Sequence, residues 1–247
     1  MAVTLEVLGC GDAFGSGGRF NSCYLLASGD RLTLVDCGGS APAALQQRAV
    51  TQPDIGIVVL THLHGDHFGG VPFLLMDAAY NRQRTTPLIV AGPPGLETRI
   101  MDTLELLFPG APARVRERVP LTITELDAGV TRQVGHLGVL PFAVRHPSGA
   151  PSFALRIAIE DKVVAFSGDA AWDSVLAEAS RDADLFVCEC TGYRKPVPFH
   201  VSLADLEEHR EELTAQRIIL THLGGEMLQH TEEAPWPCAA DGLVVAL

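Results

Sequence analysis

The sequence has few basic residues for its length: 18 Lys and Arg stand against 30 Asp and Glu, which gives a net charge of −12 over 247 residues. A protein that binds nucleic acid over a broad surface needs clustered Lys and Arg. The composition therefore argues against nucleic acid as a partner. A local site for a small anion stays open, because bound metal ions would offset part of the negative charge.

Segments that would take the chain to a membrane are also lacking. No uninterrupted apolar run approaches the ~20 residues that span a bilayer. The first residues, "MAVTLEVLGCG", show no basic segment followed by an apolar stretch, which a signal peptide would require. We expect a cytoplasmic protein with no membrane partner.

Paired cysteine motifs are missing as well. Cys188 and Cys190 form CxC rather than CxxC, and no second pair completes a zinc knuckle. In a reducing compartment the cysteines are expected to be small buried hydrophobic residues. They are Cys10, Cys23, Cys37, Cys188, Cys190 and Cys238.

The chain does contain many short β-rich runs separated by helical patterns. The expected strands cover residues 3–9, 22–28, 32–36, 55–61, 87–92, 138–146, 152–160, 162–169, 184–190, 217–223 and 242–247. Apolar spacings of three and four predict helices over 71–83, 95–108, 171–181 and 202–216, the last capped by Ser202 with Asp205. This alternation indicates an α/β protein with helices on the outer faces of its sheets. Without an obvious linker, residues 1–247 are predicted to form one domain.

Polar residues that can bind metals stand where several expected strands end. If these strands lie side by side, their terminal side chains converge on one rim, which is where open sheets place their sites. The residues are Asp36, His62, His146, Asp169, Glu189 and His222.

The densest group of metal-binding side chains is the stretch "THLHGDH". Imidazole and carboxylate are the usual ligands of zinc and similar divalent ions. His62 and His64 point the same way on an extended segment, and Gly65 allows the turn that brings Asp66 and His67 around. A lone histidine would more simply be a hydrogen-bonded loop residue, but a cluster this compact indicates a metal site.

Three further candidates lie elsewhere in the chain, at His146, Asp169 and His222. With the four of the cluster they make seven, which is too many for one ion. Seven ligands suit two ions that share a bridging carboxylate, an arrangement that clamps a transferring phosphoryl or acyl group.

The motif "THLHGDH" resembles the signature of the metallo-β-lactamase fold hydrolases, and the resemblance extends to "LVDCGG", "FSGDA" and "LTHLGG". The segments "LGCGDAFGSGGRFNS", "CECTG" and "FHVSLADL" are similar to the branch of ribonuclease Z and the cyclic phosphodiesterases. The resemblance implies a four-layer αββα sandwich, in which two mixed β-sheets face each other and helices cover the outer faces.

The resemblance also implies how the seven ligands divide between two divalent ions. The two sets, joined by Asp169 as a bridge, are His62, His64 and His146 for one ion and Asp66, His67 and His222 for the other. Zinc suits this histidine-rich set best, while manganese and iron accept similar ligands. Asp36 would either orient a ligand from behind or cap a backbone group at its strand end.

Three residues are implied in catalysis. His200 matches the histidine that in this branch faces the substrate phosphate and protonates the leaving oxygen, a task that suits an imidazole near neutral pH. Glu189 would hold the tautomer of His200 or serve only the structure. Asp66, besides binding metal, would accept a proton during attack by a hydroxide held between the two ions.

The resulting hypothesis is a metal-dependent hydrolase, most simply a phosphodiesterase for a small anionic substrate, linear or cyclic. The alternatives are a lactone, ester or β-lactam hydrolase with the same metals, a tRNA 3′-processing endonuclease, and a metal-binding protein without turnover. Only 22 residues separate His146 from Asp169, too few for the basic arm of ribonuclease Z, so tRNA processing is disfavoured. The early glycines do not form GxGxxG, so no nucleotide cofactor is predicted. Relatives are often dimers, which leaves a homodimer and a monomer both open.

Overall fold

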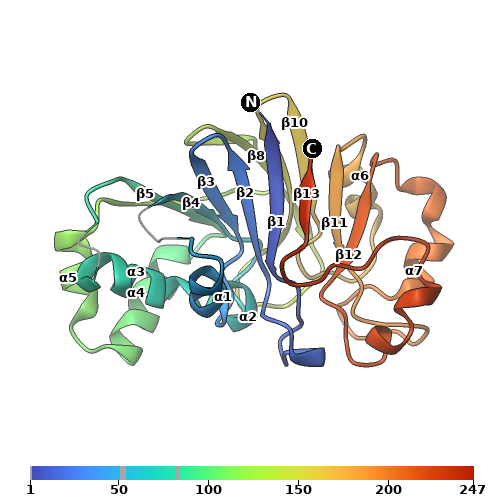
Figure 1. Cartoon of the computed structure of the whole chain (residues 1–247), viewed down its shortest axis with the longest axis horizontal. Helices are drawn as coiled ribbons and strands as arrows, with labels where there is room; N and C mark the ends of the chain where they lie inside the picture. The colour runs from blue at the N-terminus through green and yellow to red at the C-terminus, as the bar shows by residue number, and fades with distance from the viewer. Residues whose placement is uncertain (1, 51–53, 82–83) are drawn as a thin grey trace.

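The chain is described by a computed structural model that covers residues 2–50, 54–81 and 84–247. Within these ranges the strands form two sheets, which Figure 1 shows face to face at the centre of the molecule. The seven strands of the first sheet are, in spatial order, β13 (Val244–Ala246), β1 (Val3–Gly9), β2 (Cys23–Ser28), β3 (Arg31–Val35), β4 (Ile55–Val59), β5 (Leu88–Gly92) and β6 (Leu121–Glu125). The six of the second are β12 (Ile218–Thr221), β11 (Leu185–Glu189), β10 (Lys162–Phe166), β9 (Ser152–Ile159), β8 (Leu137–Val144) and β7 (Arg132–Val134).

Both sheets are mixed, and each has a parallel and an antiparallel half. In the first sheet β13, β1, β2 and β3 are antiparallel neighbours, whereas β3 to β6 run parallel. In the second sheet β12, β11 and β10 run parallel, and β10 to β7 are antiparallel. The carboxyl ends of the parallel strands therefore form a rim on each sheet. Beside these rims the sheets are joined, because the amide of Phe153 donates to the carbonyl of Thr61 at 3.0 Å.

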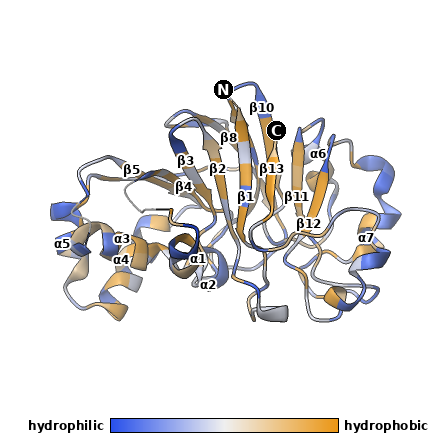
Figure 2. Ribbon diagram, viewed as in Figure 1, coloured by the Kyte–Doolittle hydropathy of each residue, from blue (hydrophilic) through white to orange (hydrophobic). Residues whose placement is uncertain are grey.

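The space between the sheets is filled by apolar side chains from both. Leu5 and Val59 of the first sheet belong to one buried cluster with Leu155 and Val187 of the second. Burying a side chain of this size contributes ~1.5–3 kcal/mol, so this layer is a main source of the fold's stability. Figure 2 shows the strands as mostly hydrophobic and the flanking helices as a mixture of hydrophobic and hydrophilic residues.

Helices complete the layers on both outer faces. The residues of α1 (Ala41–Gln47), α3 (Val71–Met76), α4 (Leu96–Leu107) and α5 (Ala111–Arg118) that point inward pack in one cluster with the first sheet. Those of α6 (Ser174–Ser180) and α7 (Leu203–Glu208) pack with the second sheet. This arrangement confirms the predicted αββα sandwich (Figure 1). Single turns of helix are α2 (Gly65–Phe68), η1 (Ser16–Gly18), η3 (Asp77–Asn81), η4 (Arg210–Glu212), η5 (Met227–Gln229) and η6 (Thr231–Glu233).

Most of the predicted elements are present, although several are shorter than expected. The strand predicted over 162–169 ends at Phe166, because the chain turns at Gly168 before reaching Asp169. The helix predicted over 71–83 is α-helical only to Met76 and then widens into a π turn, and residues 82–83 lie outside the described residues. The helix predicted over 202–216 ends at Glu208, and a 3₁₀ turn follows it.

Apart from single turns of helix, four elements of the described residues were missing from the sequence prediction. Helices α1 and α5 each begin with a proline in the first turn, which reads as a loop signal although proline is tolerated there. Strand β7 has only three residues and two of them are exposed, so it carries no apolar pattern. Strand β6, "LTITE", does alternate, but it is an edge strand with partly exposed side chains. Among the described residues no helix is long and apolar enough to cross a membrane.

Candidate metal centre

The predicted convergence of strand ends is observed. Asp36 follows β3, His62 follows β4, Asp169 follows β10 and His222 follows β12, all within three residues of the strand ends. His146 follows β8 from the antiparallel half of the second sheet. These five side chains are buried at the shared rim of the two sheets.

Tight backbone turns bring these side chains together. Gly168 has φ +57°, and a Cβ atom there would lie 2.5 Å from the carbonyl oxygen of Phe153. A Cβ on Gly38 would lie 2.1 Å from the carbonyl oxygen of Asp66, so the loop after β3 packs directly against the histidine-rich segment. Asp36 and His222 themselves have φ of +55°, a conformation that costs a non-glycine residue ~1–3 kcal/mol and is typical of functional sites.

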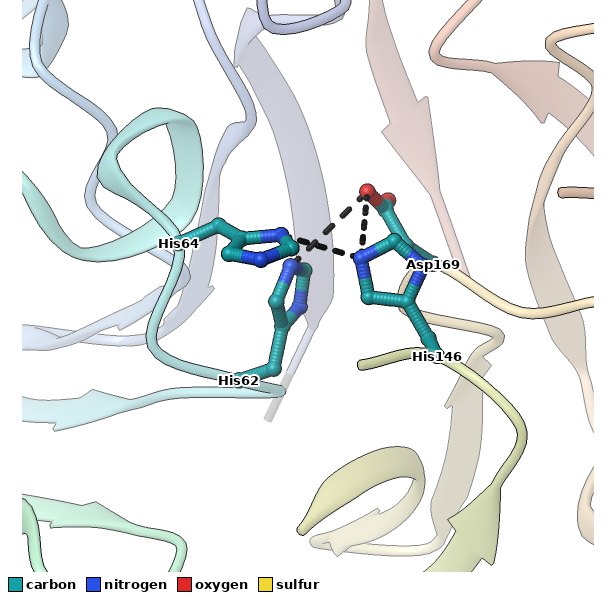
Figure 3. A group of neighbouring side chains, drawn as sticks. All are labelled: His62, His64, His146 and Asp169. Carbon is teal, nitrogen blue, oxygen red and sulfur yellow. Dashed lines mark hydrogen bonds and ion pairs between the residues drawn. The ribbon is translucent and has the colours of Figure 1, made fainter. Parts of the chain in front are cut away.

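One quartet consists of His62, His64, His146 and Asp169, whose ligand atoms all lie within 4.8 Å of one another. Figure 3 shows these four side chains pointing toward a common centre. His146 Nε2 lies 3.0 Å from His64 Nδ1 and 3.7 Å from Asp169 Oδ2, and His62 Nε2 lies 3.8 Å from the same oxygen. Ligands ~2.1 Å from a tetrahedral ion are ~3.4 Å apart, so these separations fit a single ion.

A second quartet consists of Asp66, His67, Asp169 and His222, and it meets the same distance criterion. Asp66 Oδ2 lies 3.2 Å from His222 Nε2 and 3.4 Å from His67 Nε2. Asp169 belongs to both quartets, with Oδ1 3.1 Å from His67 Nε2 and Oδ2 toward the first quartet. The structure thus brings all seven predicted residues together and places Asp169 between the two groups.

The hydrogen bonding of the histidine rings is suited to binding metal ions. The ring of His62 is fully buried, and within the described residues its Nε2 atom has no hydrogen-bond partner. The far nitrogens of the rings are occupied: His62 Nδ1 is bonded to Thr61 Oγ1, His67 Nδ1 to Asp36 and His146 Nδ1 to the carbonyl of Phe199. Each of these bonds leaves Nε2 facing the centre, as metal-binding histidines require.

The electrostatics of the cluster favour positive charge between the carboxylates. Burial acts to lower the pKa of His222, but the carboxylates of Asp169 and Asp66 outweigh it and raise that pKa to about 9. Burial likewise opposes protonation of His67, yet Asp169 and Asp36 raise its pKa well above the ordinary value. Burial lowers the pKa of His62 and keeps its ring neutral. Divalent cations would supply the positive charge that protons otherwise provide here.

Two carboxylates behind the cluster support it, one from each sheet. Asp36 is bonded to His67 Nδ1 at 2.7 Å and accepts bonds from the amide and hydroxyl of Thr61. Glu189 accepts from the amide of Ala170 at 2.6 Å, which holds the loop that carries Asp169. Asp36 therefore contacts a predicted ligand and also accepts from a backbone amide, so its contacts agree with both of its expected roles.

His200 lies beside the cluster without belonging to either quartet. Its Nδ1 is 3.1 Å from both carboxylate oxygens of Glu189, so the predicted contact between these two residues is present. Its ring centroid lies 5.0 Å from that of His146 and 5.5 Å from that of His222. Its side chain is 18% exposed, which leaves it open to a ligand.

The remaining histidines lie away from the centre. His209 stacks on Trp172 and His230 on Tyr193. With His136 they are half-buried.

Sequence reasoning missed two threonines of the site, Thr61 and Thr191. The signal available was the tetrapeptide Leu-Thr-His-Leu, which occurs at 60–63 and again at 220–223, each time at the end of a strand that leads into the cluster. Thr191, in contrast, follows Glu189 in the motif "CECTG" and is distant in sequence from the ligand that it contacts, His222.

Comparison of the sequence with known proteins identifies its family. The sequence profile of the family described as Anti-Pycsar protein Apyc1 matches residues 3–236. The chain belongs to the Apyc1 family. It is 40% identical over 91 residues to the Anti-Pycsar protein Apyc1 of Paenibacillus sp. (strain J14), a match that covers 37% of each chain. It is 25% identical over 245 residues to ribonuclease Z of Geobacillus kaustophilus, covering 77% of each.

Solved structures show that this member of the Apyc1 family has the metallo-β-lactamase fold, as predicted. YhfI from Bacillus subtilis, a metallo-β-lactamase fold protein, superposes with a TM-score of 0.81 at 20% identity and full coverage of both chains. The short form of human tRNase Z superposes with a TM-score of 0.78 at 22% identity over 98% of each chain. At these identities the likeness concerns the fold, so substrate and activity must be argued from the site.

Proposed function

We propose that this Apyc1-family protein is a metal-dependent phosphodiesterase that hydrolyses a small phosphodiester, cyclic nucleotides included. The observation that carries the proposal is the position of His200 beside two metal-binding quartets. A phosphodiester is an anion with a basic leaving oxygen. It therefore calls for cations at the phosphate and for an acid at the leaving group, and this site offers both.

Glu189 keeps His200 suited to act as the acid. Burial acts to lower the pKa of His200, but the hydrogen bond and charge of Glu189 raise it above its ordinary value. With Nδ1–H donated to Glu189, Nε2 is the nitrogen that can give a proton to the leaving oxygen. We assign His200 as the general acid and Glu189 as the residue that fixes its orientation.

We assign one divalent ion to each quartet, with zinc as the ion best suited to the histidine-rich donors. Such ions acidify water and stabilise the negative charge that develops on phosphate oxygens. Burial acts to raise the pKa of Asp66, but bonds from His222 and His67 lower it far below the ordinary value, so the carboxylate is ionised. Asp66 would accept a proton from the attacking water and, being a weak base, pass it on to solvent.

The structure also favours a small substrate over transfer RNA. The segment between His146 and Asp169 is the hairpin of β9 and β10, whose turn consists of Glu160 and Asp161. Two acidic residues at this tip would repel a phosphate backbone rather than bind it.

Purified protein reconstituted with zinc or with manganese should be assayed on one panel of substrates. The panel comprises bis(p-nitrophenyl) phosphate, cyclic purine and pyrimidine mononucleotides, a lactone, a chromogenic β-lactam and precursor tRNA. We expect turnover of the phosphodiesters, and a fall in kcat of about 10²–10⁴-fold for His200→Ala on the cyclic nucleotides with metal content unchanged. His209→Ala, a histidine stacked on Trp172, is the matched control and should leave kcat unaltered.

Other outcomes select the alternatives. Turnover of only the lactone or β-lactam would replace the phosphodiesterase with the ester-hydrolase alternative, and cleavage of precursor tRNA would restore the endonuclease. No turnover by fully metallated protein would favour a binding protein. Light scattering on the same sample distinguishes the monomer from the homodimer.

A further inference from the structure

Thr191 links the two functional halves of the site. Its hydroxyl oxygen lies 2.9 Å from His222 Nδ1, a member of the second quartet, and 2.8 Å from Glu189 Oε2. It also lies 3.4 Å from His200 Nδ1. One hydroxyl group therefore touches a predicted metal ligand and the carboxylate that orients the predicted acid.

The hydrogen-bond inventory fixes the direction of these bonds. A hydroxyl has a single proton, and its acceptors here are Glu189 Oε2, 2.8 Å away, and the carbonyl oxygen of His222, 3.0 Å away. Neither of these oxygens can donate, so Thr191 is the donor toward them. The oxygen lone pairs then accept from Nδ1–H of His222. This places a proton on Nδ1 of His222 and leaves Nε2, 3.2 Å from Asp66 Oδ2, as the nitrogen available to a metal ion.

The same pattern occurs in the first sheet. There Thr61 donates to Asp36 and is bonded to His62 Nδ1, while Asp36 also bonds the ring of His67. In both places a carboxylate holds one imidazole directly and a second through a threonine. The difference is that both imidazoles behind Asp36 belong to the quartets, whereas Glu189 holds His200.

We propose that Thr191 is a positioning residue that sets the tautomer of His222 and, through Glu189, couples the second quartet to His200. The proposal rests on the function proposed above. It implies that loss of the hydroxyl weakens metal binding at one quartet while the other, which His62, His64 and His146 define, is unaffected. Outer partners of this kind change metal affinity by about 10–100-fold.

The backbone of Thr191 is held independently of its hydroxyl. Its carbonyl accepts from the amide of Gly224, and the next residue, Gly192, exchanges backbone bonds with Val201 and Leu203. Thr191→Val keeps the shape of the side chain and removes only the hydrogen bonds, whereas Thr191→Ser restores them. Thr214→Val is the matched control, since Thr214 accepts from the amide of Asp182, away from the centre.

The test is a titration of metal-free protein with Zn²⁺ alone by calorimetry, repeated with Co²⁺ to follow its ligand-field bands. We expect two binding events in the unaltered protein. In Thr191→Val one event should weaken by about 10–100-fold and the other should not change. Thr191→Ser and Thr214→Val should behave as the unaltered protein. If Thr191→Val does not fold, Thr191→Ala takes its place.

Equal binding of both ions by Thr191→Val, or failure of Thr191→Ser to restore the weakened event, would overturn the proposal. A kinetic readout separates it from the proposed function: kcat on a cyclic nucleotide should fall in Thr191→Val even at saturating Zn²⁺, with KM nearly unchanged. Unaltered protein that binds two ions but hydrolyses no phosphodiester would refute the proposed function and leave the metal-binding result for Thr191 intact.

Discussion

His67 Nδ1 lies 2.7 Å from Asp36 Oδ2, in an environment where both side chains are almost fully buried. Replacing Asp36 with Asn keeps one oxygen for the amide of Thr61 but places an NH2 group, which donates and cannot accept, opposite His67 Nδ1. We expect Asp36→Asn to lower metal affinity by about 10–100-fold, measured by competition with a chelating dye. Asp184→Asn removes a carboxylate bonded to Val163 and Lys162 at the opposite end of the second sheet, and it should leave metal affinity unchanged.

Removing the metal should destabilise the protein. The quartets crowd the carboxylates of Asp66 and Asp169 with five imidazoles in a buried volume, and bound cations would neutralise and link these groups. An ion present at 100 times its Kd stabilises the folded state by about 2.7 kcal/mol. We expect the melting temperature to fall after chelation and to recover when Zn²⁺ is restored, as followed by calorimetry. A chelated sample shown by elemental analysis to be metal-free, yet melting as before, would contradict this expectation.

The role of Glu189 should depend on the leaving group of the substrate. Glu189→Gln removes the negative charge that raises the pKa of His200, so a smaller fraction of the imidazole carries the proton that the leaving oxygen needs. We expect kcat on a cyclic nucleotide, whose leaving alkoxide needs a proton, to fall by about 10²-fold or more. With bis(p-nitrophenyl) phosphate, whose leaving group is a stable phenolate, the loss should be small. Equal losses on both substrates would argue for a purely structural Glu189.

The predicted cap at the start of α7 is confirmed and offers a stability test separate from chemistry. Ser202 Oγ accepts from the amide of Asp205, and Asp205 accepts from the amide of Ser202, which forms a capping box. We expect Ser202→Ala to lower the free energy of unfolding by about 1 kcal/mol in urea denaturation. Because His200 precedes this cap by two residues, a change in kcat without any change in unfolding would show that the cap serves mainly to place His200.

The cysteines should resist alkylation in the folded protein. Burial and the neighbouring Asp241 raise the pKa of Cys10 to about 12, and burial raises that of Cys37 to about 12. A raised pKa leaves little thiolate at any pH below it, so labelling with iodoacetamide at pH 8 should be slow and should speed up as the pH rises. Cys238 is only partly buried and should react first, as mass spectrometry of the peptides would show. Rapid labelling of Cys10 or Cys37 in the native protein would contradict the burial on which this expectation depends.

The sequence alone indicated the seven residues of the quartets, and its resemblance to the metallo-β-lactamase fold hydrolases implied the sandwich. Strand ends such as Val59 and Thr221 lead directly into His62 and His222, and parallel strands bring their carboxyl ends to one rim whatever the loops do. Local spacing likewise predicted the Ser202 cap, since that motif lies within four residues. These features depend on short-range pattern or on general rules of sheet topology.

Only the tertiary structure showed which threonine hydroxyl groups form hydrogen bonds to the predicted metal ligands. The carboxylate of Asp36 contacts His67, which lies 31 positions further along the chain. The hydroxyl of Thr191 contacts His222, also 31 positions further along, and no periodicity in the sequence encodes either contact. The contact of His200 with Glu189 was predicted, but the bond from Thr191 to the same carboxylate became visible only once the loop after β11 had folded back. Residue types and strand order fix which side chains can meet, but the tautomer and charge of each imidazole are set by a single neighbour, and that neighbour is known only once the chain is packed.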